Sequence, residues 1–357
     1  MEASSYYPII FTTQKTMILQ SIASSFPESS YSQSACLEGM EQADFWPCLD
    51  GRSRVLLSKV LGGDSGIDKR HFALDRLEDA WSRDAQELNE AYEKDAPRVA
   101  SGAVRKALEK AGVKVEEVDA LFVCSCTGFL CPGVSSHLAE QLGMRADVLL
   151  QDMTGLGCGA AVPMLRVASG FLAQNPDAIV VTVAVEICSA AFYVEDDFGV
   201  LISTCLFGDG ASAGVWKGVG AGLSVGAFES IHMPEEREMI RFTNAQGKLR
   251  NQLDRKVPEL AGKAVEALYQ KRELLEPTHW VTHGGGRDVI EQLEEVLPIK
   301  ENTLARRVMR EYGNLSSPSV LVALEILLDE DPEADRIWMC SFGAGFSAHS
   351  CELIRVS

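Results

Sequence analysis

The pattern of hydrophobic residues predicts helices and strands that alternate along the first half of the chain. Between residues 82 and 112, apolar residues recur at helical spacing and Gly112 supplies a stop. Residues 119–126 and 148–151 are predicted strands, and the run 178–185 is continuously apolar, as strands covered on both faces are. Helices are predicted at 135–142 and 158–173, and the second is apolar nearly all round, which predicts a central, buried helix.

The second half repeats this order of elements. Helices are predicted at 257–275, 287–297 and 317–328, and strands at 280–283 and 336–342, followed by a last strand. Ser317 is the expected N-cap of the third helix, with Pro318 at its first position. A glycine-rich stretch at 218–226 marks the boundary between two halves, 1–220 and 221–357. Alternating helices and strands predict an α/β fold with mixed, mainly parallel sheets.

Composition and charge narrow the class of protein. The chain has 357 residues, of which 46% are hydrophobic and 24% charged, so it can bury a large core. Its net charge of −18 argues against nucleic acid as a partner. No apolar run approaches the roughly 20 residues that cross a bilayer, and the first residues lack the basic start of a signal peptide. We therefore expect a cytoplasmic protein without stable membrane insertion, whose ten cysteines are reduced thiols.

Three residues whose side chains could take part in catalysis occupy equivalent places in the predicted order of helices and strands. Cys158, His283 and Asn314 each border a predicted strand, beside glycine and near the start of a helix. Strand ends and helix starts line the ligand crevice of α/β sheets, so the three side chains are expected in one pocket. A thiol at a helix N-terminus also loses its proton more easily, which favours a nucleophilic Cys158. Taken singly, each has a structural explanation: a packed cysteine, a core histidine and a turn asparagine.

A set of ordered motifs carries a family resemblance. Gly157-Cys158-Gly159 is followed by four further motifs, and together they resemble the type III polyketide synthases related to chalcone synthase, from about Lys69 to the C-terminus. The four are Leu206-Phe-Gly-Asp-Gly210, His283-Gly-Gly-Gly286, Gly313-Asn-Leu-Ser-Ser317 and Phe342-Gly-Ala-Gly345. The resemblance implies a thiolase-like, five-layered αβαβα fold of two similar halves, assembled as a homodimer.

The resemblance also implies a reaction and the residues that perform it. Cys158 would carry the starter and growing acyl chain, while His283 and Asn314 would bind the malonyl-CoA thioester and stabilise the enolate left by decarboxylation. Repeated condensation and cyclisation would yield a pyrone, resorcinol or phloroglucinol. Phe207 would stand at the pocket entrance, Ser316 would line the cavity, and the Gly343-Ala-Gly345 turn would shape it. Coenzyme A thioesters would be substrates, and no cofactor is implied.

Several positions depart from the plant members of the family. Asn251 stands where a second aromatic gate is usual, and Cys126 and Ala191 replace pocket threonines, as in microbial members. The basic cluster that binds coenzyme A does not align, and Arg52, Arg54 and Lys59 are the nearby substitutes. The sequence therefore does not decide whether the acyl donors are thioesters of coenzyme A or of an acyl-carrier protein.

Three other interpretations compete with this one. A single-step β-ketoacyl synthase uses the same Cys, His and Asn, although the His-Gly-Gly-Gly and Phe-Gly-Asp-Gly motifs favour the polyketide synthase. A non-enzymatic scaffold with the thiolase fold is disfavoured because all three catalytic positions are filled. Cys124, Cys126 and Cys131 have no second Cys/His pair at ligand spacing, so we expect no metal site.

Overall fold

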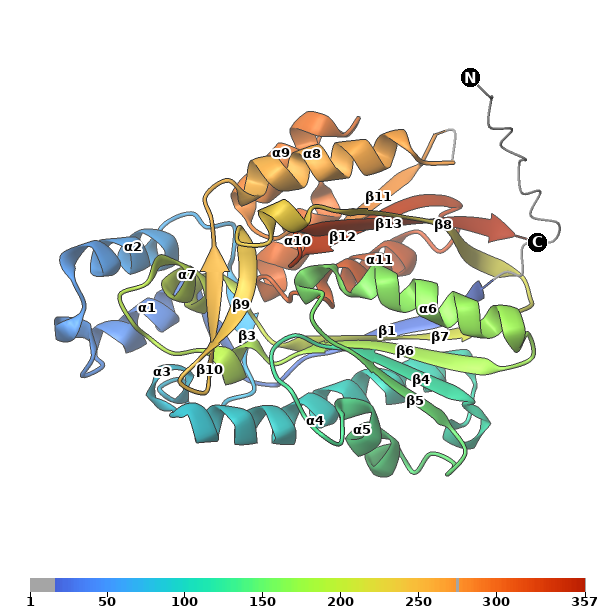
Figure 1. The fold of residues 1–357 in the computed structure, drawn as a ribbon, viewed down its shortest axis with the longest axis horizontal. Helices are drawn as coiled ribbons and strands as arrows, with labels where there is room; N and C mark the ends of the chain where they lie inside the picture. The colour runs from blue at the N-terminus through green and yellow to red at the C-terminus, as the bar shows by residue number, and fades with distance from the viewer. Residues whose placement is uncertain (1–16, 274–275, 357) are drawn as a thin grey trace, which may run out of the picture.

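A computed structural model describes residues 17–273 and 276–356 and shows five layers (Figure 1). Helices α8 and α9 cover one sheet, α4 and α5 cover the other, and α6 and α11 lie between the two sheets. The predicted αβαβα arrangement is confirmed.

The elements of residues 17–217 begin with a strand that was not predicted. In chain order they are β1 (Met17–Ser25), β2 (Ser30–Ser32), α1 (Gln33–Glu41), α2 (Gly51–Gly62), β3 (Lys69–His71), α3 (Asp79–Ser82), α4 (Ala85–Ala111), β4 (Ala120–Cys124), α5 (Val134–Leu142), β5 (Leu149–Met153), α6 (Ala161–Gln174), β6 (Ile179–Glu186), α7 (Phe198–Leu206) and β7 (Gly210–Lys217).

The elements of residues 222–356 include a hairpin that was also not predicted. In chain order they are β8 (Gly222–His232), β9 (Ile240–Ala245), β10 (Lys248–Leu253), α8 (Val257–Gln270), β11 (His279–Thr282), α9 (Arg287–Val296), α10 (Thr303–Tyr312), α11 (Ser319–Glu330), β12 (Arg336–Gly343) and β13 (Ser347–Val356). None of the described helices is long and apolar enough to cross a membrane.

The two sheets are joined edge to edge by hydrogen bonds between β8 and β1, so their strands form one continuous hydrogen-bonded series. The strand order is β11-β12-β13-β8-β1-β7-β6-β4-β5, and β1 links the halves because it pairs with β8 on one side and β7 on the other. Parallel pairing joins β4 to β5, β4 to β6 and β11 to β12, while the other pairs are antiparallel. The predicted mixed sheet is confirmed, but parallel pairing is less extensive than expected. β8 follows β7, and β13 follows β12, through short turns rather than helical crossovers, and β7 pairs antiparallel with β6 although α7 lies between them.

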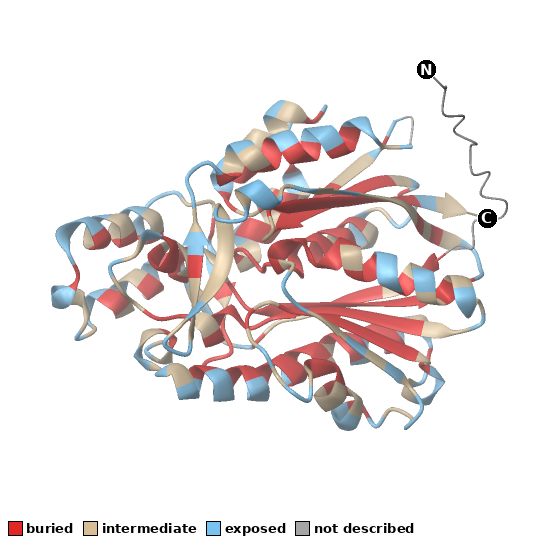
Figure 2. Ribbon diagram, viewed as in Figure 1, coloured by how far each residue is buried: buried red, intermediate tan, exposed pale blue. Residues whose placement is uncertain are grey.

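Alternation along the strands decides which layer each side chain enters. On β4, Phe122 packs against the central helices, while Leu121 and Val123 face α4 and α5. On β12, Met339 faces the central helices and Trp338 faces α8 and α9. Figure 2 shows that the strands and the inward faces of the helices are buried. The central helices therefore sit in a rigid, apolar layer, and their N-termini are fixed relative to both sheets.

Three predicted boundaries are corrected. The α8 helix ends at Gln270 with Lys271 as its C-cap, short of the predicted residue 275, and residues 274–275 lie outside the described residues. The helix predicted to begin at Cys158 begins at Ala161, and Cys158 lies in a short 3-10 turn (Gly157–Gly159) before it. Ser317 does not cap α11, because its hydroxyl donates to Glu186 instead, and Pro318 is the N-cap residue.

Candidate active site

Cys158 lies at the N-terminal end of the central helix layer and is buried. Its turn is held from behind by the end of β12, where the Ser341 hydroxyl donates to the carbonyl oxygen of Gly159 at 2.9 Å. Gly343 is packed so closely there that a Cβ would lie 2.7 Å from the backbone nitrogen of Gly159 and 2.9 Å from that of Cys158. The predicted Gly343-Ala-Gly345 turn therefore packs behind the cysteine, and neither Gly343 nor Gly345 lines the pocket beside Ser316 that is described below.

The same strand end contacts His283, which follows β11. The Phe342 ring meets the His283 imidazole edge to face, with centroids 5.1 Å apart. His283 is 2% exposed, and its Nδ1 has no hydrogen-bond partner among the described residues. Residues 341–343 of β12 thus touch both the cysteine turn and the histidine, which places both at one end of the central layer.

Asn314 joins the histidine loop to the cysteine. Its side-chain amide donates to the carbonyl oxygen of Gly285 at 2.7 Å, and its Oδ1 accepts from the backbone N–H of Ser316 at 2.8 Å. The Ser316 hydroxyl in turn lies close enough to the Cys158 thiol to lower its pKa. An asparagine amide has two N–H groups, so one donor is left for a ligand. The three predicted residues are therefore brought together.

Electrostatics at Cys158 differ from the sequence-based expectation. Burial raises the pKa of Cys158 to about 12, and the Glu186 carboxylate adds to the rise, while the Ser316 hydroxyl opposes it. The expectation that the helix N-terminus lowers this pKa is wrong, because desolvation of the thiolate outweighs the other effects. The free enzyme holds a neutral thiol at neutral pH.

His283 is also neutral. Burial lowers its pKa from 6.5 to about 4, and no ionised partner offsets the desolvation. A neutral imidazole beside a neutral thiol is not the ion pair of a cysteine protease. It suits a site in which His283 donates a hydrogen bond to a carbonyl oxygen.

Glu186 is a central residue that the sequence analysis missed. This fully buried carboxylate ends β6 and accepts hydrogen bonds from backbone and side-chain donors on two loops. The donors belong to Ser125, Cys126, Thr127, Ser316 and Ser317. Cys126, predicted to line the pocket, lies in this network, with its sulfur 3.4 Å from the Ser316 hydroxyl. The sequence feature that could have identified Glu186 is a lone glutamate at the end of an apolar strand, because a buried charge is costly unless it has hydrogen-bond partners or a function.

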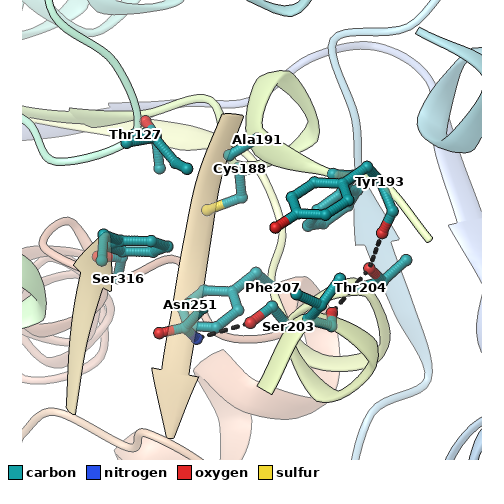
Figure 3. A pocket seen from close by; sticks show the side chains of 13 residues that line it. Thr127, Cys188, Ala191, Tyr193, Ser203, Thr204, Phe207, Asn251 and Ser316 are labelled. Atoms are coloured by element: carbon teal, nitrogen blue, oxygen red, sulfur yellow. Dashed lines mark hydrogen bonds between the residues drawn. The ribbon is translucent and has the colours of Figure 1, made fainter. Parts of the chain in front are cut away.

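A pocket lies beside Ser316 (Figure 3). It contains four of the predicted pocket residues, Phe207, Ala191, Asn251 and Ser316. Asn251 is buried on β10, and its amide donates to the Ser203 hydroxyl of α7 at 2.6 Å. The sequence analysis did not predict the other lining residues, which are Thr127, Cys188, Phe192, Tyr193, Val200, Ser203, Thr204, Phe242 and Leu249.

The predicted basic residues lie apart from this cavity on α2, which packs against α7. Arg52 and Lys59 are exposed and Arg54 is half-buried, and none of them forms an ion pair within the described part of the chain. They are free to meet an anion. Among residues 17–273 and 276–356, no group of His, Cys, Asp and Glu is arranged to hold a metal ion.

Comparison with known proteins decides the family. The family model for FAE1/type III polyketide synthase-like proteins matches residues 31–218, more than half of the chain, and that for the C-terminal domain of chalcone and stilbene synthases matches residues 230–347. The chain belongs to the type III polyketide synthase family. The predicted family is thus confirmed, and a type III polyketide synthase is an acyltransferase of the condensing type.

Similar proteins include several bacterial members of this family. The 3,5-dihydroxyphenylacetyl-CoA synthase of Amycolatopsis orientalis is 29% identical over 87% of this chain and 85% of its own. The phloroglucinol synthase of Pseudomonas fluorescens is 26% identical over 90% of this chain and 95% of its own.

Solved structures agree in fold. The 1,3,6,8-tetrahydroxynaphthalene synthase of Streptomyces coelicolor has a TM-score of 0.83 at 25% identity, covering 95% of this chain and 99% of its own. PKS-I of the brown alga Ectocarpus siliculosus has a TM-score of 0.88 at 22% identity, covering 96% and 98%. The relatives make polyketides, which supports the polyketide interpretation over a single-step β-ketoacyl synthase.

Proposed function

We propose that this enzyme condenses malonyl-CoA decarboxylatively onto an acyl group carried by Cys158, repeats the step and cyclises the product. The observation that carries the proposal is the chain of contacts from the Cys158 thiol through Ser316 and Asn314 to the loop of His283. It gives one nucleophile and two neutral donors at one end of the central layer.

Decarboxylation requires a place for negative charge. When carbon dioxide leaves a malonyl thioester, the electron pair of the broken bond moves toward the thioester oxygen. The imidazole of His283 and the second amide N–H of Asn314 are the donors that would stabilise this oxygen. Both side chains are at most 4% exposed, so water competes little for the same oxygen. No metal ion is required for this step.

Loading of Cys158 exchanges one thioester for another. The sulfur attacks the starter carbonyl, coenzyme A leaves, and the thiol proton departs with it as the free coenzyme A thiol. Because burial raises the pKa of Cys158 to about 12, the neutral thiol is the main form of the enzyme before the attack. The enolate carbon of the next malonyl unit then attacks the acyl group on Cys158 and lengthens it by two carbons.

The cavity beside Ser316 is the proposed room for the growing chain. Its walls carry hydroxyl, amide and apolar groups, and no Lys or Arg side chain lines it. The donors are proposed to be coenzyme A thioesters bound near Arg52, Arg54 and Lys59, with carrier-protein thioesters as the alternative that the same basic residues would accept.

A homodimer is the proposed assembly. Phe129 is 75% exposed, and Leu149 is 44% exposed on β5, which is the edge strand of the sheet. Exposed apolar side chains beside an unpaired edge favour association with a second copy. Light scattering after gel filtration would return twice the chain mass if this proposal holds.

Product analysis tests the proposed function. Purified enzyme is incubated with malonyl-CoA and acyl-CoAs of increasing length, and the products are identified by mass. We expect cyclised products that contain at least two malonyl-derived units. A single extension without cyclisation would support the β-ketoacyl synthase, and release of no product from any starter would support a scaffold.

A further inference from the structure

Arg70, on β3, is a buried cation that the reaction described above does not use. It is 1% exposed and forms no ion pair among the described residues. Its guanidinium donates to the carbonyl oxygen of Thr204 at 2.7 Å, to that of Phe207 at 2.9 Å and to the side-chain oxygen of Gln33 at 2.9 Å. A buried charge without an ionised partner is costly, so its position calls for an explanation.

The carboxyl end of α7 is part of that explanation. Thr204 lies in the last turn of α7, and Phe207 is its C-cap, so Arg70 bonds carbonyl groups that have no partner within the helix. The negative end of the helix dipole offsets part of the desolvation of the guanidinium. Gln33 fixes the helix end further, because its amide donates to the carbonyl oxygen of Cys205 at 2.9 Å.

The segment that Arg70 fixes pairs directly with Asn314. The backbone N–H of Asn314 donates to the carbonyl oxygen of Leu206 at 2.8 Å, and that of Gly208 donates to the carbonyl oxygen of Asn314 at 3.0 Å. Arg70 bonds the carbonyls on either side of Leu206 in sequence, and thereby leaves that oxygen for Asn314.

Packing around Gly313 leaves little freedom in this arrangement. Gly313 has φ of +74°, and a Cβ there would lie 2.7 Å from Cγ of Arg70 and 2.7 Å from the carbonyl oxygen of Leu206. The stem of Arg70 is therefore in contact with the residue before Asn314, while its guanidinium holds the carbonyls of Thr204 and Phe207 on either side of Leu206. Movement of Arg70 would be transmitted to Asn314 from both sides.

We propose that Arg70 is a positioning residue for the decarboxylation step: by holding the end of α7, it places the amide of Asn314 beside the loop of His283. This inference rests on the proposed function, and specifically on the role given to Asn314. The charge of Arg70 also reaches the cavity, because it opposes the rise in the pKa of Cys188 that burial and the carboxylates of Asp209 and Glu186 cause.

The test separates decarboxylation from cysteine chemistry. Arg70→Lys keeps the charge but loses the planar guanidinium that bonds two carbonyls at once. Release of acetyl-CoA from malonyl-CoA and alkylation of Cys158 by iodoacetamide are measured on wild type, Arg70→Lys and Arg145→Lys. Arg145 is a matched control, because it also bonds a backbone carbonyl, that of Glu116, and lies in the loop that precedes β5.

We expect Arg70→Lys to lower kcat for decarboxylation about 10- to 100-fold with KM changed less than about twofold, since a misplaced donor is lost only in the transition state. Alkylation of Cys158 should change less than about threefold, and Arg145→Lys should match wild type. In an Asn314→Ala background, Arg70→Lys should cause little further loss, because both changes then remove the same donor.

Three results would overturn the proposal: unchanged decarboxylation in Arg70→Lys, an equal loss of decarboxylation and alkylation, or a full additional loss in the Asn314→Ala background. If Arg70→Lys does not fold, Gln33→Met decides, since it frees the guanidinium without removing it. A several-fold loss of decarboxylation is then expected, and wild-type activity would contradict the role of Arg70. Absence of acetyl-CoA release by wild type would instead refute the proposed function itself.

Discussion

The side-chain amide of Asn314 lies 2.7 Å from the carbonyl oxygen of Gly285, two residues after His283. These residues come from loops on different elements, one after β11 and one before α11. The hydrogen bond uses one amide N–H, so one donor of Asn314 is left beside the loop of His283. The proposed oxyanion site is therefore built by one contact between two loops.

Replacing the buried carboxylate should change the reactivity of Cys158. Glu186→Gln removes a charge that raises the pKa of the thiol, so alkylation of Cys158 at pH 8 should be faster than in wild type. In wild type, the rate should rise about tenfold per pH unit up to pH 9, because the pKa of about 12 lies far above this range. A plateau below pH 8 would contradict the neutral thiol.

The same substitution should destabilise the fold. In Glu186→Gln, the introduced amide nitrogen would face N–H and O–H donors that bond a carboxylate oxygen in wild type, at a cost of about 2–4 kcal/mol. Urea unfolding of wild type and Glu186→Gln measures this loss of stability. The alkylation rate is determined at urea concentrations at which the variant is still folded.

The pH dependence of decarboxylation should report a neutral His283. Its pKa is lowered from 6.5 to about 4, so between these values the unfolded chain binds a proton that the folded chain does not. Its contribution to stability is present above pH 6.5 and is lost as pH falls toward 4. The rate of acetyl-CoA release from malonyl-CoA should accordingly show no inflection near pH 6.5. An inflection there that His283→Gln abolishes would contradict a neutral imidazole.

Asn251 should govern which starters fit. Asn251→Phe adds a ring to the wall of the pocket and breaks the hydrogen bond to Ser203, so the range of accepted acyl-CoAs should narrow toward short chains. Asn244→Phe is the matched control, because Asn244 is exposed on the other strand of the same hairpin. Competition between acyl-CoAs of different length measures the preference, and an unchanged preference in Asn251→Phe would remove Asn251 from the determinants of starter size.

Gly343→Ala should damage the cysteine turn. The added Cβ would lie under 3 Å from the backbone of Cys158 and Gly159, so the turn must shift at a cost of about 1–3 kcal/mol, and acylation should slow. Gly170→Ala provides the contrast, because its Cβ meets nothing within 4 Å, and alanine in a helix is about 0.5–1 kcal/mol more stable than glycine. The melting temperature and the rate of acylation by a starter acyl-CoA are measured for both variants. Equal melting temperatures of Gly343→Ala and Gly170→Ala would contradict the close packing of Gly343.

Local patterns predicted most of the layered core. The α4 helix and strand β6 follow directly from apolar spacing and from a continuous β-branched run, because their partners are the generic apolar faces of neighbouring layers. Strand β1 and the hairpin β9–β10 escaped prediction. The hairpin has few buried residues, so its sequence lacks a strong alternation, and β1 is buried by both halves at once.

The site was predicted less completely, for a physical reason. Cys158, His283 and Asn314 stand in recognisable glycine-rich motifs, whereas Glu186 and Arg70 act through contacts between segments far apart in the chain. The direction of the pKa shift of Cys158 was predicted wrongly for the same reason, since the sequence shows where the helix starts but not how deeply the thiol is buried. Ser317 was predicted to cap a helix because local sequence shows only the helix start. Its actual partner, Glu186, lies 131 residues away in the chain.

Mass measurement of the intact enzyme tests the central claim most directly. Wild type and Cys158→Ala are incubated with a starter acyl-CoA, and their masses are recorded before and after malonyl-CoA is added. The account predicts that wild type gains the mass of one acyl group, that malonyl-CoA removes or lengthens it, and that Cys158→Ala gains none and makes no polyketide. Undiminished malonyl-CoA-dependent product formation by Cys158→Ala would contradict Cys158 as the nucleophile.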